Sequence, residues 1–229
     1  MKVAVFSTGD EVQAPGTEQK ANSIYDSNRF TIMGMLEKLG CEILDFGILE
    51  DNEQLMIEAL ENASAQADVV MTSGGVSVGD ADYIKLALDN LVKSILANQH
   101  ASGTSISVWS NQQQAVLWSA GQPCCVMVSF INFVEPALRK MQGEQGWKPL
   151  KVNAIATENL RSRQGRTEFS RGIYELDDTG RLTVRTTGKQ GSGILRSMSE
   201  ANCLIEISPA IDTVKAGESV TIIPLQGRI

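Results

Sequence analysis

The sequence predicts a three-layer α/β sandwich with a mostly parallel sheet, followed by a small all-β, barrel-like domain. Up to about residue 143, short apolar runs alternate with segments of helical periodicity, which is typical of a parallel sheet covered by helices. Beyond that point, short β-type runs are separated by turn residues. A glycine-rich turn between an apolar run and a helical segment is typical of open α/β sheets that bind ligands at strand ends. We therefore expect domains over residues 1–145 and 146–229.

Strands and helices alternate in the first predicted domain. Short apolar runs predict buried strands at Lys2–Phe6, Cys41–Phe46 and Ala67–Met71. Apolar residues at helical spacing predict helices at Arg29–Leu39, Glu53–Ala65 and Tyr83–Leu91, and a further helix near Val126. The first helix is expected to stop at Gly40, because glycine often follows the last helical residue. The residues Gly47–Asp51 are expected to form the loop after the second strand.

The second predicted domain consists of short strands. They are expected at Leu150–Ala156, Thr167–Glu175, Arg181–Thr186, Asn202–Ile207 and Ser219–Pro224. Turn residues such as Asp178-Thr179-Gly180 separate them. This pattern predicts a barrel or a compact sandwich.

The glycine-rich turn is the most informative stretch of the chain. Residues 72–83 read T-S-G-G-V-S-V-G-D-A-D-Y. Exposed backbone N–H groups before a helix favour anions, so this turn predicts a phosphate cradle. The carboxylates of Asp80 and Asp82 are suited to coordinate a divalent metal that also binds the phosphate oxygens. The alternative is a flexible turn capped by Asp80, but the whole string favours the cradle.

A second pair of motifs follows the first strand. Residues 7–11 read S-T-G-D-E, and residues 22–28 read N-S-I-Y-D-S-N. Parallel strands end at one rim of the sheet, where ligands bind. Taken singly, Asp26 or Ser27 is better explained as a helix cap. The residues expected to share the rim are Glu11, Asp26, Asn28, Ser73, Asp80 and Asp82.

These three motifs, in this order and spacing, resemble the molybdopterin molybdenumtransferase family, called MoeA in bacteria and the E domain of gephyrin in animals. Residues 165–172 (G-R-T-E-F-S-R-G) and 187–192 (T-G-K-Q-G-S) resemble motifs of the family's C-terminal β domain. The resemblance covers residues 1–91 and 126–229. It implies a transferase of molybdenum cofactor biosynthesis that inserts molybdate into adenylylated molybdopterin and releases AMP. It also implies Mg²⁺, a homodimer, and the molybdopterin adenylyltransferase as a partner.

The resemblance also implies roles for individual residues. The catalytic residues are Glu11, Asp51 and Asp82, and the metal ligands are Glu11 and Asp82. Asp51 could equally be a helix N-cap. The residues expected to bind the pterin substrate are Thr8, Gly9, Asp26, Asn28, Ser73, Gly74, Gly75, Ser77, Gly79 and Asp80.

The segment Val92–Cys125 departs from the family pattern. Family members carry P-G-[KR]-P, L-A-F-G and G-L-P-G-N-P there, and this chain does not. Reverse translation of His100–Ser110, read one base later, permits M-R-P-G-R-P-L-A-F-G, and the same shift of Trp118–Cys125 permits G-L-P-G-N-P-V. We infer that the segment is translated out of frame, with a divergent loop as the alternative. His100, Cys124 and Cys125 therefore receive no role, and the missing basic loop leaves turnover by this chain open.

Sequencing the gene across Val92–Cys125 is expected either to reveal two compensating insertions or deletions relative to close relatives or, if the shifts are sequencing errors, to restore P-G-R-P and G-L-P-G-N-P. An out-of-frame segment is not matched to the core, so we also expect it to be the least well-formed part of the α/β domain. Its Gln- and Ser-rich middle offers little apolar area against the ordering entropy. An intact reading frame, unshifted relative to close relatives, would contradict the inference.

Composition excludes several classes of function. A formal net charge of −7 disfavours a nucleic-acid surface, which needs clustered Lys and Arg. The four cysteines lack metal-ligand spacing, and the apolar stretches are too short for a membrane span. Met1 leads directly into a strand, so we expect no signal peptide and a cytoplasmic protein.

Two alternative functions remain open, and the length of the chain has two possible explanations. The α/β part also resembles molybdopterin adenylyltransferases, which suggests a molybdopterin-binding module, but the G-K-Q-G-S tail favours molybdenum insertion. A scaffold role, by analogy with gephyrin, would need a partner surface that the sequence does not indicate. The two N-terminal domains of family members are missing, which predicts either a fragment or a short reading frame.

Overall fold

The computed structural model describes residues 1–74, 99–101, 104–110, 115–119 and 122–225, with the backbone alone for residues 99–119. The chain divides into two compact units. The first comprises residues 1–99 and 104–142, and the second comprises residues 100–103 and 143–229. The first unit is an α/β fold and the second contains a closed barrel, so the predicted fold class is confirmed.

The first unit is built on a mostly parallel sheet. Its order is β4 (Glu42–Leu49), β1 (Lys2–Thr8), β5 (Val69–Ser73), β8 (Ala115–Ser119), β7 (Thr104–Ser110) and β6 (Gln99–Ala101). The strand β1 pairs in parallel with both β4 and β5, and β5 pairs in parallel with β8. Only β7 is described as antiparallel to its neighbour β8. The ends of β1, β4 and β5 therefore lie at one rim, as the sequence predicts.

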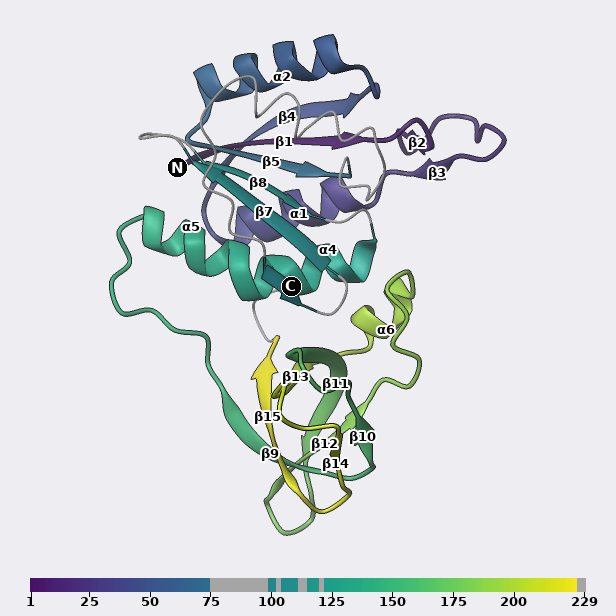
Figure 1. The fold of residues 1–229 in the computed structure, drawn as a ribbon, viewed down its shortest axis with the longest axis vertical. Helices are drawn as coiled ribbons and strands as arrows, with labels where there is room; N and C mark the ends of the chain where they lie inside the picture. Colours follow the sequence, from purple (N-terminus) through teal and green to yellow (C-terminus); the bar gives the residue numbers. More distant parts are fainter. Residues whose placement is uncertain (75–98, 102–103, 111–114, 120–121, 226–229) are drawn as a thin grey trace. The chain divides into compact units, whose positions relative to one another are not determined.

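Helices cover both faces of this sheet (Figure 1). They are α1 (Asn28–Lys38), α2 (Glu53–Gln66), α4 (Pro123–Ser129), the π-helix η1 (Phe130–Val134) and α5 (Glu135–Met141). The helix α2 lies on one face, and α1 and α4 lie on the other. Alternate β1 residues explain the layering, since Ala4 and Phe6 pack with Met56 and Leu60 of α2 in one buried cluster. Among the described residues, no helix is long and apolar enough to cross a membrane.

Two predictions about this unit are wrong. The strand β4 continues to Leu49, so the expected loop at Gly47–Asp51 begins only at Glu50. A register shift between Val5 and Phe6 places Gly47 opposite Phe6, and Gly47 has a φ of +74°. Glycine tolerates this backbone at a bulge, so the strand does not have to end there.

Regular structure also occurs in the segment Val92–Cys125, whose sequence shows no clear periodicity. Its described parts form β6, β7 and β8, and α4 begins at Pro123 rather than near Val126. Proline suits the first turn of a helix because its missing N–H would be unpaired there. Residues 92–98 and the predicted helix Tyr83–Leu91 lie outside the described residues.

The second unit contains a closed barrel. Its order is β11 (Glu168–Leu176), β12 (Leu182–Thr186), β9 (Val152–Ala156), β15 (Ser219–Pro224) and β13 (Cys203–Ile207), and all five match predicted strands. The barrel interior holds Val184, Ile205 and Ile222. A Cβ added at Gly172 of β11 would lie only 2.7 Å from Cγ1 of Ile205. The tight packing of the barrel therefore requires glycine at this position.

The shortest elements are absent from the sequence-based expectations. They are β2 (Val12–Gln13), β3 (Ile24–Tyr25), β10 (Leu160–Arg161), β14 (Thr213–Val214) and α6 (Leu195–Ser199). Such short runs carry too little periodicity to predict, and the four strands among them are defined by pairing with partners distant in sequence.

Candidate functional site

A pocket of about 120 Å³ lies in the first unit where β1 and β5 end. Its lining comes from the ends of these two strands, the loop after β1, the first turn of α1 and the start of α4. Six residues predicted to bind substrate or act in catalysis line it: Thr8, Glu11, Asp26, Asn28, Ser73 and Gly74. Parallel strands deliver these residues to one rim although they come from distant parts of the chain.

The pocket floor depends on a close approach between β1 and the residue after β5. Gly74 has a φ of +94°, and a Cβ there would lie 2.4 Å from the carbonyl oxygen of Thr8. Only glycine allows this contact. Thr8 is 3% exposed, and its Oγ1 has no hydrogen-bond partner within the part of the chain that the structure describes. A buried hydroxyl that lines a pocket without a partner indicates a place for a polar ligand atom.

Two serines and an asparagine connect the strand ends to α1. Ser7 and Ser73 are register partners on the neighbouring strands β1 and β5, so their side chains share one face of the sheet. Asn28, the first residue of α1, donates from Nδ2 to Oγ of Ser73 at 2.9 Å. This hydrogen bond holds the first turn of α1 against the end of β5.

Asp26 and Arg29 form a buried ion pair at the same wall of the pocket, and the more exposed Asp45 extends it into a network. Asp26 accepts hydrogen bonds from the backbone N–H of Arg29 at 3.1 Å and from Nε of Arg29 at 2.9 Å. The Arg29 guanidinium also pairs with Asp45 of β4. Burial acts to lower the pKa of Arg29, but the hydrogen bonds and charges of both aspartates outweigh it and raise that pKa. Asp26 therefore lines the pocket while its carboxylate is already engaged inside the protein.

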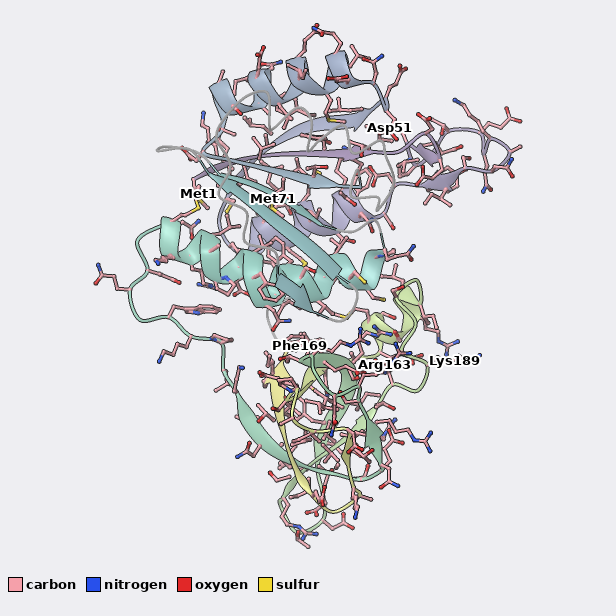
Figure 2. All side chains as sticks on the ribbon, in the orientation of Figure 1. Met1, Asp51, Met71, Arg163, Phe169 and Lys189 are labelled. Carbon is pink, nitrogen blue, oxygen red and sulfur yellow. The ribbon has the colours of Figure 1, made fainter. Side chains whose placement is uncertain are left out.

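Acidic side chains gather at the rim of the site. The carboxylate of Glu11 lies against Gly9, where a Cβ would be 2.8 Å from Oε2 of Glu11. Asp51 lies at the end of the sheet toward which β1 and β4 run (Figure 2). Partial desolvation raises the pKa of Asp51, and the negative charges of Asp10 and Glu11 raise it further. Asp10 and Glu11 therefore repel the charge of Asp51, and Glu11 is the one of the three that lines the pocket.

The alternative role of Asp51 as a helix N-cap is wrong. Asn52 is the N-cap of α2, and its side chain accepts a hydrogen bond from the backbone N–H of Leu55 at 3.1 Å. Asp51 is exposed and makes no such bond among the described residues. Its carboxylate is thus not used to stabilise the helix.

Replacing Asp51 with asparagine is expected to raise the free energy of unfolding slightly at pH 7, by less than about 0.5 kcal/mol for an exposed group. A raised pKa means that folding disfavours the charged carboxylate, so removing the charge relieves repulsion. The gain should shrink as the pH falls through the raised pKa of Asp51, because the wild-type side chain then becomes protonated.

Urea unfolding between pH 4 and 8 measures this effect. Asp178→Asn, in the exposed turn between β11 and β12, is the control and should leave the pH profile unchanged. A loss of stability in Asp51→Asn at pH 7 would contradict the repulsion argument.

Part of the predicted site lies outside the described residues. These residues are Gly75, Ser77, Gly79, Asp80 and Asp82. The expected convergence of Glu11 with Asp82 therefore stays a prediction. Within the described ranges, no three His, Cys, Asp or Glu side chains are grouped so that they could hold a metal ion.

Two residues of this site were missed from the sequence. Ser7 lies within the S-T-G-D-E motif, yet a serine at the end of a buried strand gives no signal until its register partner Ser73 is known. Arg29 was assigned only to the helix. Its spacing of three residues from Asp26 is the signal that could have indicated the ion pair.

Comparison with known proteins agrees with this architecture. Residues 4–140 match the family model described as "Probable molybdopterin binding domain", and residues 153–225 match the MoeA C-terminal region (domain IV). A molybdopterin molybdenumtransferase of Haemophilus influenzae is 40% identical over 98% of this chain and 56% of its own length. Its counterpart in a Nostoc species is 30% identical over 98% of this chain and 53% of its own length.

Solved structures give the same result. The molybdopterin biosynthesis MoeA protein of Pyrococcus horikoshii matches with a TM-score of 0.76 and 29% identity, over 97% of this chain and 53% of its own length. The chain thus spans about half the length of the relatives it matches. Since the first family model covers more than half of the chain and the second covers most of the barrel, the chain belongs to the molybdopterin molybdenumtransferase family.

Proposed function

We propose that this chain is the substrate-binding part of a molybdopterin molybdenumtransferase, which inserts molybdate into adenylylated molybdopterin and releases AMP. One observation carries the proposal: the pocket gathers Glu11, Asn28 and Ser73 at the ends of parallel strands in a chain of this family. Thr8 supports it, because it lines the pocket and its buried hydroxyl has no partner among the described residues. We also propose that the boundary between the two domains lies between residues 145 and 146. The protein is proposed to be a cytoplasmic homodimer that receives its substrate from the molybdopterin adenylyltransferase.

The negative charge at the rim would favour a nearby Mg²⁺, although the described carboxylates form no metal-binding group by themselves. The carboxylates of Asp10, Glu11 and Asp51 concentrate negative charge, which raises the pKa of Asp51 and which a divalent cation would relieve. We propose Glu11 and Asp82 as its ligands, with Asp51 acting beside them. Bound Mg²⁺ would neutralise charge on the diphosphate of the substrate.

The remaining roles follow from position and chemistry. Glu11, Asp51 and Asp82 are proposed as the catalytic residues. We propose that Gly74, Gly75 and Ser77 hold phosphate oxygens through backbone and hydroxyl groups, because short backbone turns present N–H groups to anions. Thr8, Gly9, Asp26, Asn28, Ser73, Gly79 and Asp80 complete the proposed binding residues.

In a full-length relative that carries glutamate at the position of Glu11, its replacement with glutamine is expected to slow molybdate-dependent AMP release roughly 10- to 100-fold. Binding of adenylylated molybdopterin should weaken far less, because the lost carboxylate serves the metal rather than the pterin. Single-turnover AMP release and equilibrium binding measure the two effects separately.

The same change in this chain provides the control for folding. Since Glu11 is exposed, Glu11→Gln should alter the free energy of unfolding by less than about 0.5 kcal/mol. Unchanged AMP release in the relative, or an equal loss of binding and rate, would count against the proposed role of Glu11.

A further inference from the structure

We propose that Ser7 determines which chemical group the pocket accepts, by presenting a hydrogen-bond acceptor to an N–H group on the ring of the ligand. Asp26 and Arg29 are the positioning residues that fix this polarity. The inference rests on the proposed function. It adds that the pocket wall formed by β1 and α1 binds an uncharged ring edge that carries an amino group, rather than a phosphate.

The polarity of Ser7 follows from its partner. Ser7 is 2% exposed, lines the pocket, and donates from Oγ to Oδ1 of Asp26 at 3.1 Å. Asp26 is 4% exposed, and its carboxylate, paired with Arg29, can only accept hydrogen bonds. A serine hydroxyl has a single hydrogen, and Ser7 donates it in the hydrogen bond to Asp26. Toward a ligand, Ser7 Oγ can therefore only accept a hydrogen bond through its lone pairs.

Arg29 makes this arrangement stable. Its side chain is 7% exposed and contacts both Asp26 and Asp45, so it keeps the Asp26 carboxylate paired and oriented. The backbone N–H of Arg29 donates to the same Oδ1 that accepts from Ser7. The carboxylate therefore cannot turn away from Ser7 without losing two bonds to Arg29.

The neighbouring strand presents the opposite polarity. Ser73 is 3% exposed and accepts a hydrogen bond from Nδ2 of Asn28 at 2.9 Å, so its own hydrogen is available to donate. Ser7 and Ser73 are register partners on strands whose backbones lie about 5 Å apart, so they present an acceptor and a donor on one face of the sheet. This pair is complementary to a planar heterocycle that carries an amino group and an oxo group along one edge.

Charge supports the same assignment. The single positive charge of Arg29 faces the two aspartates Asp26 and Asp45, so this network carries no positive charge to attract an anion. A phosphate oxygen ionised at neutral pH also has no hydrogen to give to Ser7. The diphosphate of a substrate would be repelled here, whereas an amino group would gain a hydrogen bond.

Binding of two matched ring probes to this chain tests the inference. Pterin carries a 2-amino group and a 4-oxo group on the same ring edge, with N3 between them, and lumazine carries an oxo group in place of the amino group. Fluorescence titration should give a Kd for pterin about five- to tenfold lower than for lumazine, which corresponds to one net hydrogen bond. Ser7→Ala should bring this ratio close to one.

Two variants separate recognition from folding. Ser73→Ala should weaken both probes and keep their ratio, because both carry the 4-oxo group. Asp26→Asn replaces the acceptor behind Ser7 with an amide that can donate, which releases the Ser7 hydrogen toward the pocket. This variant should lower the preference for pterin even if Ser7→Ala does not fold, and a purely structural role of Asp26 would leave the ratio unchanged.

The outcomes are distinguishable. A pterin preference that persists in both Ser7→Ala and Asp26→Asn overturns the inference. Equal binding of pterin and lumazine by the wild-type chain also overturns it, while leaving the proposed pterin-binding function in place. Failure of the wild-type chain to bind either probe overturns the inference and the proposed binding function together.

Discussion

Replacing Arg29 with methionine is expected to lower the free energy of unfolding by about 3–5 kcal/mol. The substitution keeps most of the side-chain volume but leaves Asp26 buried without its cation, since the Asp26 side chain is only 1% exposed. An uncompensated buried carboxylate costs far more than a surface ion pair contributes. The measurement is urea unfolding of the first unit, followed by a probe specific to it, because the chain contains two units.

Arg196→Met provides a matched control. Arg196 also pairs with an acid one helical turn away, Glu200, but its side chain is 83% exposed. Its loss should leave the free energy of unfolding of the second unit, to which Arg196 belongs, nearly unchanged, as is usual for exposed pairs. An effect of Arg29→Met as small as that of Arg196→Met would show that the Asp26–Arg29–Asp45 network is not needed for stability.

Gly74→Ala is expected to destabilise the first unit by roughly 2–5 kcal/mol, the sum of two costs. A side chain at φ +94° is strained by about 1–2 kcal/mol. In addition, its Cβ would lie 2.4 Å from the Thr8 carbonyl oxygen, and relieving such an overlap costs about 1–3 kcal/mol. The ends of β1 and β5 would have to separate, which widens the pocket floor. Binding of pterin should therefore weaken along with the stability.

Gly40→Ala separates the two causes. Gly40 follows α1 with a φ of +69°, and a Cβ at this position would have no other atom within 4 Å. This variant should lose only the conformational part, about 1 kcal/mol, and should keep its pterin affinity. If Gly74→Ala were no more damaging than Gly40→Ala, the close contact with Thr8 would have no energetic importance.

Periodicity and turn chemistry were enough to predict the longer elements. The helix α2 and the barrel strand β15 match their predicted ranges within one residue at each end. Elements that a bulge or a distant partner controls were predicted less well. The strand β4 runs past Gly47 because a register shift against β1 accommodates the glycine, and no local pattern announces such a shift.

Local sequence by itself determined which chemical groups reach the rim: a glycine-rich turn after one strand, S-T-G-D-E after another, and an asparagine at the first turn of a helix. Strand order placed them together, and parallel pairing of β1 with β5 brought Ser7 beside Ser73. Only the tertiary structure decided what each group does there. Asp26, which lines the pocket, gives its carboxylate to Arg29 and Ser7, because a charge this deeply buried must be paired.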